Sequence, residues 1–560
     1  MNRFLLRTFL RYLVALPVLG FLVIFLLYPI YAVVAGGADI TMIGEVFKSS
    51  LYREGLVNAL LIALGTTLIS FIISLPLALL YNRFEFPGKE VCNLLIMAPM
   101  ILPPFVGALG FQQLLGYYGV FNAVLTGLGF ERINFLAGEG RFWAVCAIEA
   151  LHLYPVLYLN LVTSLANVDP ALHEAARNLG AGWFTRLRRI TLPLIRPGIF
   201  AGGSIILIWS FTELGTPLMF GFTNVTPVQV FFGITELERN AMPLALTVVM
   251  LAGSSLLYIV GRLLLGRPGA ASAVKGTLGA SAERLAGGCR FLPLLLFGLV
   301  TFAAVLPHIS LILLAFSGDW YNTVLPSSYT FLNFENALSD SLVIPSIINS
   351  LQYSFTAMLL AVLLGVMISV IVVRWKLRGG WILDALSMLP LAVPGIVMAF
   401  GFLVLSYRNP VLNTLFDVEN NPLLLLAVAY AVRRLPYVVR SVSSGLEQTP
   451  EELELAARNL GAGSFTVLKR ITLPLILANV IVGGLFAFSF SMLEVSDSLI
   501  LAQKSEFYPI TKAIYDLSQI NGSGTFIACA FGVWSMLFLG STIALAGAVL
   551  GRKIGAIFRL

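Results

Sequence analysis

Five of the ionisable residues inside long apolar runs of this 560-residue chain could contact a cargo or one another. Three are acidic, Glu213, Glu494 and Asp497, and two are the adjacent arginines Arg433 and Arg434. Carboxylate oxygens suit a hard cation, and a guanidinium suits an anionic group. Because ionisable side chains are costly inside a membrane, they either mark a transport pathway or pair with one another. The sequence leaves both open: contact with a cargo, or interhelical ion pairs that stabilise a gate.

The sequence carries no recognisable catalytic motif. It has no Gly-x-x-x-x-Gly-Lys-Ser/Thr phosphate loop, so any ATP hydrolysis must come from another chain. Its three histidines and four cysteines are scattered, with no metal-ligand, triad or redox spacing. We therefore expect no enzymatic activity and no cofactor on this chain. The only metal contact that the residues suggest is a transient one with a hard cation at the three carboxylates.

Four prolines interrupt apolar runs at matching places in the two halves of the chain: Pro99, Pro103, Pro390 and Pro394. A proline inside a membrane helix frees backbone groups, which need a cavity or a neighbouring helix to satisfy them. The prolines therefore mark either a pore wall or a packed kink. Both interpretations stay open.

The elements that position these residues are membrane-spanning helices. Hydrophobic residues make up 58% of the chain and charged residues 11%, far from the balance of a soluble domain. Runs of about 20 apolar residues, the length that crosses a bilayer, occur at 12–35, 56–81, 91–115, 142–166, 195–220, 241–265, 291–316, 346–373, 381–406, 422–445, 475–501 and 524–550. This pattern predicts an all-α membrane protein with six spans in each half.

Lysine and arginine gather in alternate loops, which predicts that both termini are cytoplasmic. With an even number of spans in each half, the two halves must be parallel repeats. We place the first repeat at 1–268, a cytoplasmic linker at 269–290 and the second repeat at 291–560. The net charge of +7 follows from this loop bias and does not indicate nucleic-acid binding.

One segment occurs almost unchanged in both repeats. Between 177–195 and 458–476, 16 of 19 positions are identical at a constant spacing of 281 residues. Each copy begins as a short helix with an apolar stripe, at 169–180 and at 449–461. Asp169 before Pro170, and Thr449 with Glu452, fit helix caps. Gly180 and Gly461 fit the left-handed residue that ends a helix.

The duplicated loops, 169–193 and 449–474, resemble the signature loop of permease subunits of type I ABC importers: Glu-Ala-Ala, three residues, Gly, nine residues, Ile-x-Leu-Pro. The resemblance implies a fused two-repeat permease that binds two ABC ATPase subunits, which carry ATP and Mg²⁺, and a periplasmic binding protein. It also implies a bacterial inner membrane location. The residues expected to couple to the ATPases are Glu174, Ala175, Ala176, Gly180, Leu455, Ala456, Ala457 and Gly461.

The second loop departs from the signature because leucine, Leu455, replaces the glutamate. Position 455 cannot contact a partner by charge as Glu174 can, so we expect the two docking sites to be unequal.

The Arg433–Tyr437 segment and the stretch from Glu213 to Pro217 resemble the ferric-iron branch of the family. The resemblance implies a transient contact of Fe(III) with Glu213, Glu494 or Asp497. Close relatives in the family carry thiamine, phosphonates or polyamines, and these cargoes remain alternatives. A secondary transporter with twelve spans is the alternative class, although it does not account for two signature loops.

Overall fold

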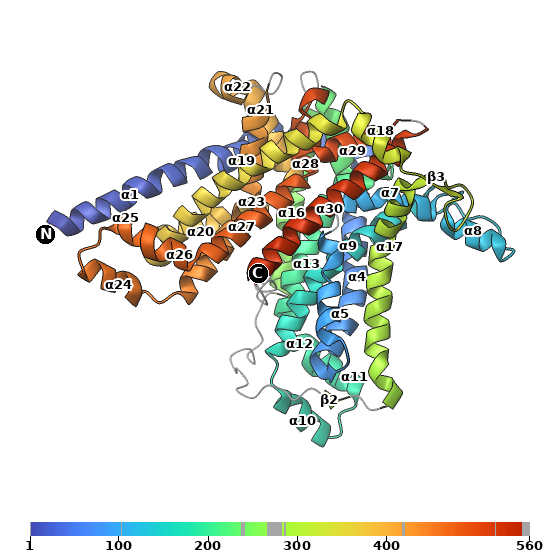
Figure 1. Cartoon of the computed structure of the whole chain (residues 1–560), viewed down its shortest axis with the longest axis horizontal. Helices are drawn as coiled ribbons and strands as arrows, with labels where there is room; N and C mark the ends of the chain where they lie inside the picture. Colours follow the sequence, from blue (N-terminus) through green and yellow to red (C-terminus); the bar gives the residue numbers. More distant parts are fainter. Residues whose placement is uncertain are drawn as a thin grey trace.

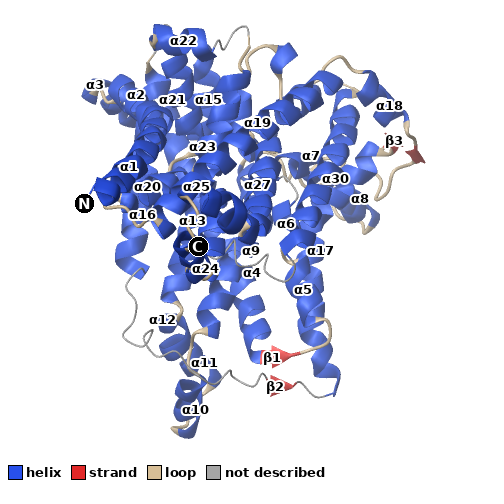
Figure 2. Cartoon of the chain, turned by 60° about the vertical axis from the view of Figure 1, so that its left-hand side comes forward, coloured by secondary structure: helices blue, strands red, loops and turns tan. Residues whose placement is uncertain are grey.

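The computed structural model describes residues 2–101, 104–236, 241–265, 283–284, 287–416, 421–520 and 522–550. These residues are almost entirely helical (Figures 1 and 2). The four strands are two or three residues long and form two separate pairs: β1 (Phe84–Glu85) with β2 (Glu283–Arg284), and β3 (Ser317–Asp319) with β4 (Ser328–Tyr329). The predicted all-α fold is confirmed.

In the first half the helices are α1 (Asn2–Leu22), α2 (Tyr28–Gly37), α3 (Ile40–Lys48), α4 (Ser50–Arg83), α5 (Lys89–Leu95), α6 (Ala98–Ile101), α7 (Pro104–Leu115), α8 (Val120–Gly127), α9 (Glu139–Ala166), α10 (Pro170–Asn178), α11 (Trp183–Arg186), α12 (Leu192–Leu194), α13 (Arg196–Phe211), α14 (Gly215–Met219), α15 (Thr226–Phe232) and α16 (Met242–Leu265).

In the second half they are α17 (Leu292–Ala315), α18 (Leu332–Ser339), α19 (Val343–Ser369), α20 (Gly380–Met388), α21 (Gly395–Arg408), α22 (Pro410–Phe416), α23 (Leu423–Gln448), α24 (Glu452–Asn459), α25 (Ser464–Val467), α26 (Leu473–Leu475), α27 (Leu477–Met492), α28 (Ser496–Leu501), α29 (Ile510–Ser518) and α30 (Gly524–Leu550).

Among the described residues, seven helices are long and apolar enough to cross a membrane, and the number reaches 11 if four bent helix pairs each count as one span. Eleven of the twelve predicted spans fall on these elements. The twelfth, 422–445, forms the helix α23, which is long enough but carries three arginines. The count of twelve therefore stays a prediction.

Several spans are not the straight helices that hydropathy suggests. The pair Gly380–Leu391 and Gly395–Tyr407 bends by 104°, with Pro390 and Pro394 at the break. Smaller bends of 69° and 73° follow the two duplicated loops at equivalent places. The break at Pro390 and Pro394 lies within the predicted span 381–406, whereas the two smaller bends lie at the start of the spans predicted from 195 and 475.

The first span of each half packs against the other half. Helix α2 lies on α21, and α17 lies on α7. Both crossings are close at equivalent glycines: a Cβ added at Gly401 would lie 2.5 Å from the carbonyl oxygen of Pro29, and one at Gly110 would lie closer still to that of Pro307. These exchanged spans join the two repeats into one body, and its largest apolar cluster draws buried side chains from both halves.

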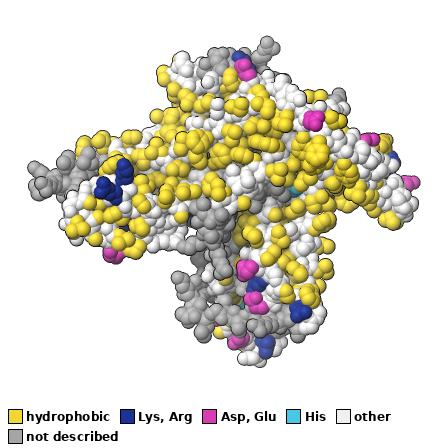
Figure 3. Space-filling view, in the orientation of Figure 1, with side chains coloured by type: hydrophobic (Ala, Val, Ile, Leu, Met, Phe, Trp, Pro, Cys, Tyr) yellow, Lys and Arg dark blue, Asp and Glu magenta, His cyan; other side chains and the backbone are white. Residues whose placement is uncertain are grey.

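The surface agrees with a membrane location. Figure 3 shows hydrophobic side chains over most of the visible face, with lysine and arginine nearer its ends. The N-terminal helix reaches the basic loop after α19, where the Arg11 guanidinium lies over the Trp375 ring and the Tyr12 hydroxyl donates to the Arg378 carbonyl. These two basic segments lie together at one end of the molecule (Figure 1). Which side of the membrane this end faces stays a prediction.

Candidate functional site

A cavity of about 270 Å³ lies between the two halves, at the level of the broken helices. Both repeats contribute to its wall. Six of the nine predicted pathway residues line it: Glu213, Pro390, Pro394, Arg433, Arg434 and Glu494. Asp497 is fully buried among them. Pro99 accepts a hydrogen bond from His152 Nδ1 at 2.7 Å through its carbonyl, and Pro103 lies outside the described residues.

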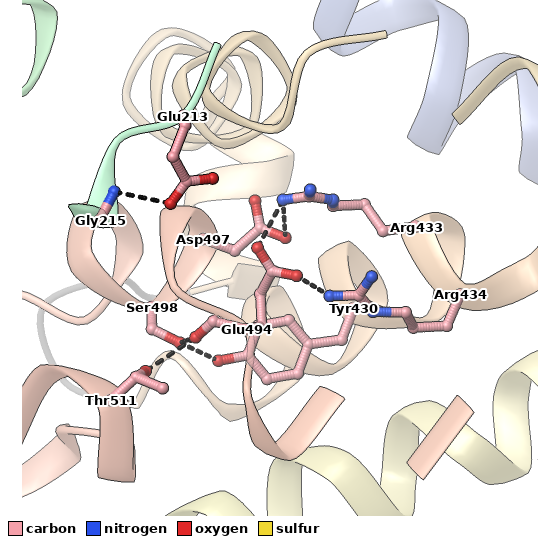
Figure 4. A network of polar contacts seen from close by, with 9 residues as sticks. All are labelled: Glu213, Gly215, Tyr430, Arg433, Arg434, Glu494, Asp497, Ser498 and Thr511. Atoms are coloured by element: carbon pink, nitrogen blue, oxygen red, sulfur yellow. Dashed lines mark hydrogen bonds and ion pairs between the residues drawn. The ribbon is translucent and has the colours of Figure 1, made fainter. Parts of the chain in front are cut away.

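In the second repeat the cationic and anionic residues form an ion-pair network (Figure 4). Arg433 and Arg434 lie midway along α23, while Glu494 lies in the break between α27 and α28. The Arg433 guanidinium lies 2.5 Å from Glu494 Oε1, and that of Arg434 contacts the other oxygen of the same carboxylate. Arg433 also lies 3.6 Å from Asp497, too far for a hydrogen bond. The structure thus shows ion pairing, one of the two alternatives that the sequence left open.

The helix break explains why a carboxylate sits at this depth. In the first repeat, Glu213 occupies the equivalent break between α13 and α14, and its Oε1 accepts from the backbone N–H groups of Gly215 at 3.1 Å and Thr216 at 3.4 Å. The first N–H groups of a helix have no partner within that helix, so a carboxylate placed just before it satisfies them. Glu213 is therefore held by the backbone rather than by an arginine.

Glu149 on α9 is a further carboxylate in the cavity wall. The Ser210 hydroxyl donates to its Oε2, and so does that of Thr66 at 3.3 Å, while Oε1 has no hydrogen-bond partner among the described residues. Position 149 is matched by Tyr430 in the second repeat, and the positions matching the two arginines hold His152 and Leu153. The first-repeat wall thus carries two carboxylates with no arginine in ion-pair contact, as far as the described residues show.

Glu149 and its hydrogen bond from Ser210 were missed in the sequence. Its signal was its position, because it is a lone acid seven residues into the predicted span 142–166. Arg440, which also lines the cavity, was missed for the opposite reason, because it lies near the end of a span where arginines are common. Within the described residues, no group of three or more histidine, cysteine, aspartate or glutamate side chains is arranged to hold a metal ion.

The two duplicated loops form matching exposed helices, α10 and α24. Both end as predicted, with Gly180 at φ +78° and Gly461 at φ +87°. The Gly180 N–H donates to the Arg177 carbonyl at 3.0 Å and the Ala181 N–H to that of Ala176 at 2.9 Å, and the second copy repeats both bonds around Gly461. This pair of bonds is the Schellman motif, and its central residue needs a left-handed backbone.

The start of α10 also follows the sequence, because the Asp169 carboxylate accepts from the Ala171 N–H at 2.9 Å. The predicted capping box at Thr449 and Glu452 is wrong. The Thr449 hydroxyl donates back to the Gly445 carbonyl at 2.8 Å, and α24 begins only at Glu452.

The predicted coupling residues occupy equivalent places on the two helices. Glu174, Ala175 and Gly180 are exposed, as are Leu455, Ala456 and Gly461, while Ala176 and Ala457 are half-buried. The apolar stripe is also largely uncovered: Leu179 is 87% exposed and Leu460 is 89% exposed. Exposed apolar side chains at a helix end favour a binding surface.

The two loops differ at one internal contact. In the second loop Glu454 is buried, lies 2.8 Å from Arg374 Nε and accepts from the Thr472 hydroxyl at 3.0 Å. His173 is the matching residue of the first loop, and burial, together with Arg186 and Arg83, lowers its pKa. Glu454, next to Leu455, is thus engaged within the chain and does not stand in for Glu174 on the surface.

This is a helical membrane chain with a charged cavity between its two halves and a pair of exposed, duplicated loop helices, and these features are typical of a transport subunit. The family of binding-protein-dependent transport system inner membrane components matches it over residues 70–268 and 361–546. Because these matches cover more than half of its length, the chain belongs to this family.

Among curated proteins, the chain is 26% identical to a ferric transport system permease of Haemophilus influenzae and 26% identical to one of Actinobacillus pleuropneumoniae. Each match covers 77% of this chain but only 66% and 61% of the relatives, so the chain spans about two thirds or less of their length. Among solved structures, a bacterial ABC transporter involved in alginate import matches 47% of the chain and 98% of its own, with 20% identity and a TM-score of 0.41.

Proposed function

We propose that this chain forms the translocation pore of an ATP-driven importer that takes ferric iron from a periplasmic binding protein. Two ATPase subunits, which carry ATP and Mg²⁺, bind at α10 and α24 on the cytoplasmic side, where both termini also lie. Their motion alternates the pore between inward-facing and outward-facing states. The chain itself supplies no ATPase. Family membership and the two exposed loop helices support this architecture.

The charge distribution in the cavity carries the choice of a cationic cargo. Arg433 and Arg434 are both engaged by Glu494, so little of their charge is left for an anion. The carboxylates of Glu149 and Glu213 face the cavity from the other repeat and are held by hydroxyl and backbone N–H groups. Hard Fe(III) prefers such oxygen atoms. With no arranged metal site among the described residues, the cation would pass by transient contacts.

Importers of thiamine, phosphonate or polyamine with the same architecture are the alternatives. A phosphonate needs the arginines, and Arg440 is the cavity arginine outside the Glu494 network. A secondary transporter of twelve spans would need no partner at α10 and α24, and it would leave the exposed Leu179 and Leu460 unexplained.

Initial-rate uptake of radiolabelled ferric iron tests the cargo. Under iron limitation, we expect uptake to fall to background when the gene for this chain is deleted, and to return when the chain is supplied from a plasmid. Unchanged iron uptake would remove iron as the cargo, and the same cells would then be tested with labelled thiamine, phosphonate and spermidine.

Replacing Gly180 or Gly461 with valine is expected to abolish uptake while leaving the protein in the membrane. Both glycines have positive φ, which costs a β-branched residue about 1–2 kcal/mol and distorts the end of the docking helix. No described atom lies within 4 Å of a Cβ added at either position, so the effect is one of the backbone and not of crowding. ATP hydrolysis by the assembled complex would persist but no longer depend on the binding protein.

Gly182→Val and Gly463→Val are the matched controls, because these glycines lie two residues further along, in equally open space, at φ −64° and φ −69°. They should transport normally. Normal uptake by the Gly180 and Gly461 variants would show that α10 and α24 do not couple transport to the ATPases.

A further inference from the structure

Between α7 and α9 the first repeat carries a longer lobe than the second repeat carries between α21 and α23, where the short helix α22 lies. The helix of the first lobe, α8, buries a polar side chain and exposes apolar ones. Helix α8 lies in the loop 116–141, which is ten residues longer than its counterpart, and it juts out beyond α7 and α17 (Figure 1). The polar side chain of Asn122 is fully buried, donates to the Gly116 and Ile133 carbonyls, and accepts from the Ile133 N–H at 2.9 Å. The outward face is apolar: Phe121 and Val124 are each 41% exposed.

An apolar cavity of about 450 Å³ lies beneath this lobe. Its walls come from α7, α9 and α17, and Phe121 and Phe135 of the lobe close one end. All of its lining residues are apolar or glycine, among them Phe111, Leu114, Trp143, Ala147, Leu151 and Leu306. The volume is within the range of small-molecule sites. The lining offers nothing to a polar ligand.

The cavity has the depth of one membrane leaflet. Along α9 its lining runs from Gly140 to Leu151. Eleven helical steps of 1.5 Å span about 16 Å, close to half of a hydrocarbon core of about 30 Å. This is the half of α9 remote from α10, because α10 follows the other end of the helix. The cavity therefore lies in the leaflet opposite the duplicated loops.

The surroundings of the cavity match a lipid-facing surface that ends at a membrane interface. On α17 the neighbouring side chains Leu299 and Phe302 are apolar and 64% and 58% exposed. At the lobe end, the Tyr118 and Tyr321 rings stack at 4.5 Å, and the Arg132 guanidinium lies 4.9 Å from the Tyr118 ring. Tyrosine and arginine side chains gather at the depth of the lipid headgroups.

We propose that this cavity binds one phospholipid of the leaflet opposite α10 and α24. One acyl chain fills the space between α7, α9 and α17, and the phosphate lies at the lobe end near Arg132 and Arg141. Arg141 is held there by the Leu136 carbonyl at 3.2 Å and the Gly221 carbonyl at 2.9 Å. Helix α8 lies over the lipid with its apolar face in the headgroup layer. The inference does not depend on the cargo.

Photo-crosslinking tests the site. The full-length protein is placed in nanodiscs of phosphatidylethanolamine and phosphatidylglycerol that contain a phosphatidylethanolamine with a diazirine near the end of one acyl chain. We expect the crosslinked peptides to map to Trp143–Leu151 and to the segment around Leu306. Ala147→Trp should lower this labelling roughly tenfold. The larger side chain takes the space of the acyl chain, which then loses the burial of about two methylene groups.

Leu299→Trp is the matched control, because it enlarges an exposed side chain on α17 outside the cavity and should keep the labelling. Ala303→Phe fills the cavity from α17 and replaces Ala147→Trp in this test if Ala147→Trp does not purify as a folded protein. Equal labelling of the filled and control variants would overturn the proposal. Labelling spread over the membrane surface in proportion to exposure would also overturn the proposal. Protection of the lobe by a soluble protein partner instead of lipid would overturn it as well.

Discussion

Replacing Glu494 with glutamine is expected to lower the thermal stability of the purified protein and to abolish uptake. The amide keeps the size of the side chain but leaves Arg434 without a carboxylate partner among the described residues, while Arg433 keeps Asp497 at 3.6 Å. Removing one partner of a buried ion pair typically costs about 3–5 kcal/mol. Thermal unfolding in detergent, followed by tryptophan fluorescence, measures the change in stability.

Glu213→Gln is the matched control at the equivalent helix break. The amide oxygen still accepts from the Gly215 N–H, and no arginine loses a partner, so stability should change by about 1 kcal/mol or less. Uptake of a cationic cargo should nevertheless fall, because a carboxylate of the cavity wall is neutralised. If the two variants lost the same stability, the Arg434–Glu494 contact would not be the interaction that holds α23 to the break between α27 and α28.

The sequence predicted those features that depend on local signals. The all-α fold follows from apolar runs of bilayer length, and the ends of α10 and α24 follow from glycines at fixed positions, both of which have positive φ in the structure. The same local logic failed at Thr449. A threonine hydroxyl can bond forward to a new helix or back to the preceding turn, and here the bond to the Gly445 carbonyl is the one that forms.

The use of the intramembrane charges could not be predicted in the same way. Arg434 and Glu494 are 60 residues apart, and their contact depends on the rotation of α23 and on where α27 ends. A hydropathy pattern predicts neither the rotation of α23 nor the residue at which α27 ends. The bend of 104° around Pro390 and Pro394 is likewise invisible to a hydropathy pattern, yet it brings both prolines into the cavity wall. The sequence could therefore name six of the cavity residues but not their partners.

Comparison of the two repeats carries information that neither repeat shows alone. Equivalent helix breaks hold Glu213 and Glu494, but among the described residues arginines lie in ion-pair contact only with the second. Equivalent loops hold His173 and Glu454, and Glu454 is paired with an arginine at the end of the neighbouring span. In the second repeat, Glu494 and Glu454 are thus both paired with arginines. Under the proposed function, the carboxylates of the first repeat are the ones that would contact a cation.

Enlarging the glycines at which the repeats cross is expected to destabilise the whole body. Gly401→Ala would place a methyl group 2.5 Å from the Pro29 carbonyl oxygen, and Gly110→Ala would meet the Pro307 carbonyl even more closely. The obstacle is backbone within a helix, so no side-chain rotation relieves it. Overpacking of this kind costs about 1–3 kcal/mol, and leucine at either position should prevent accumulation of folded protein in the membrane.

Gly298→Ala supplies the comparison, because it lies on α17 with Pro307 but has no described atom within 4 Å of an added Cβ. Since alanine is the better helix former, this variant should be as stable as the parent or slightly more so. Thermal unfolding and membrane yield of Gly110→Ala, Gly401→Ala and Gly298→Ala test this prediction. Parent-like stability for Gly110→Ala and Gly401→Ala would mean that the first spans do not cross the opposite repeat at these glycines, and the exchanged packing of α2 and α17 would have to be abandoned.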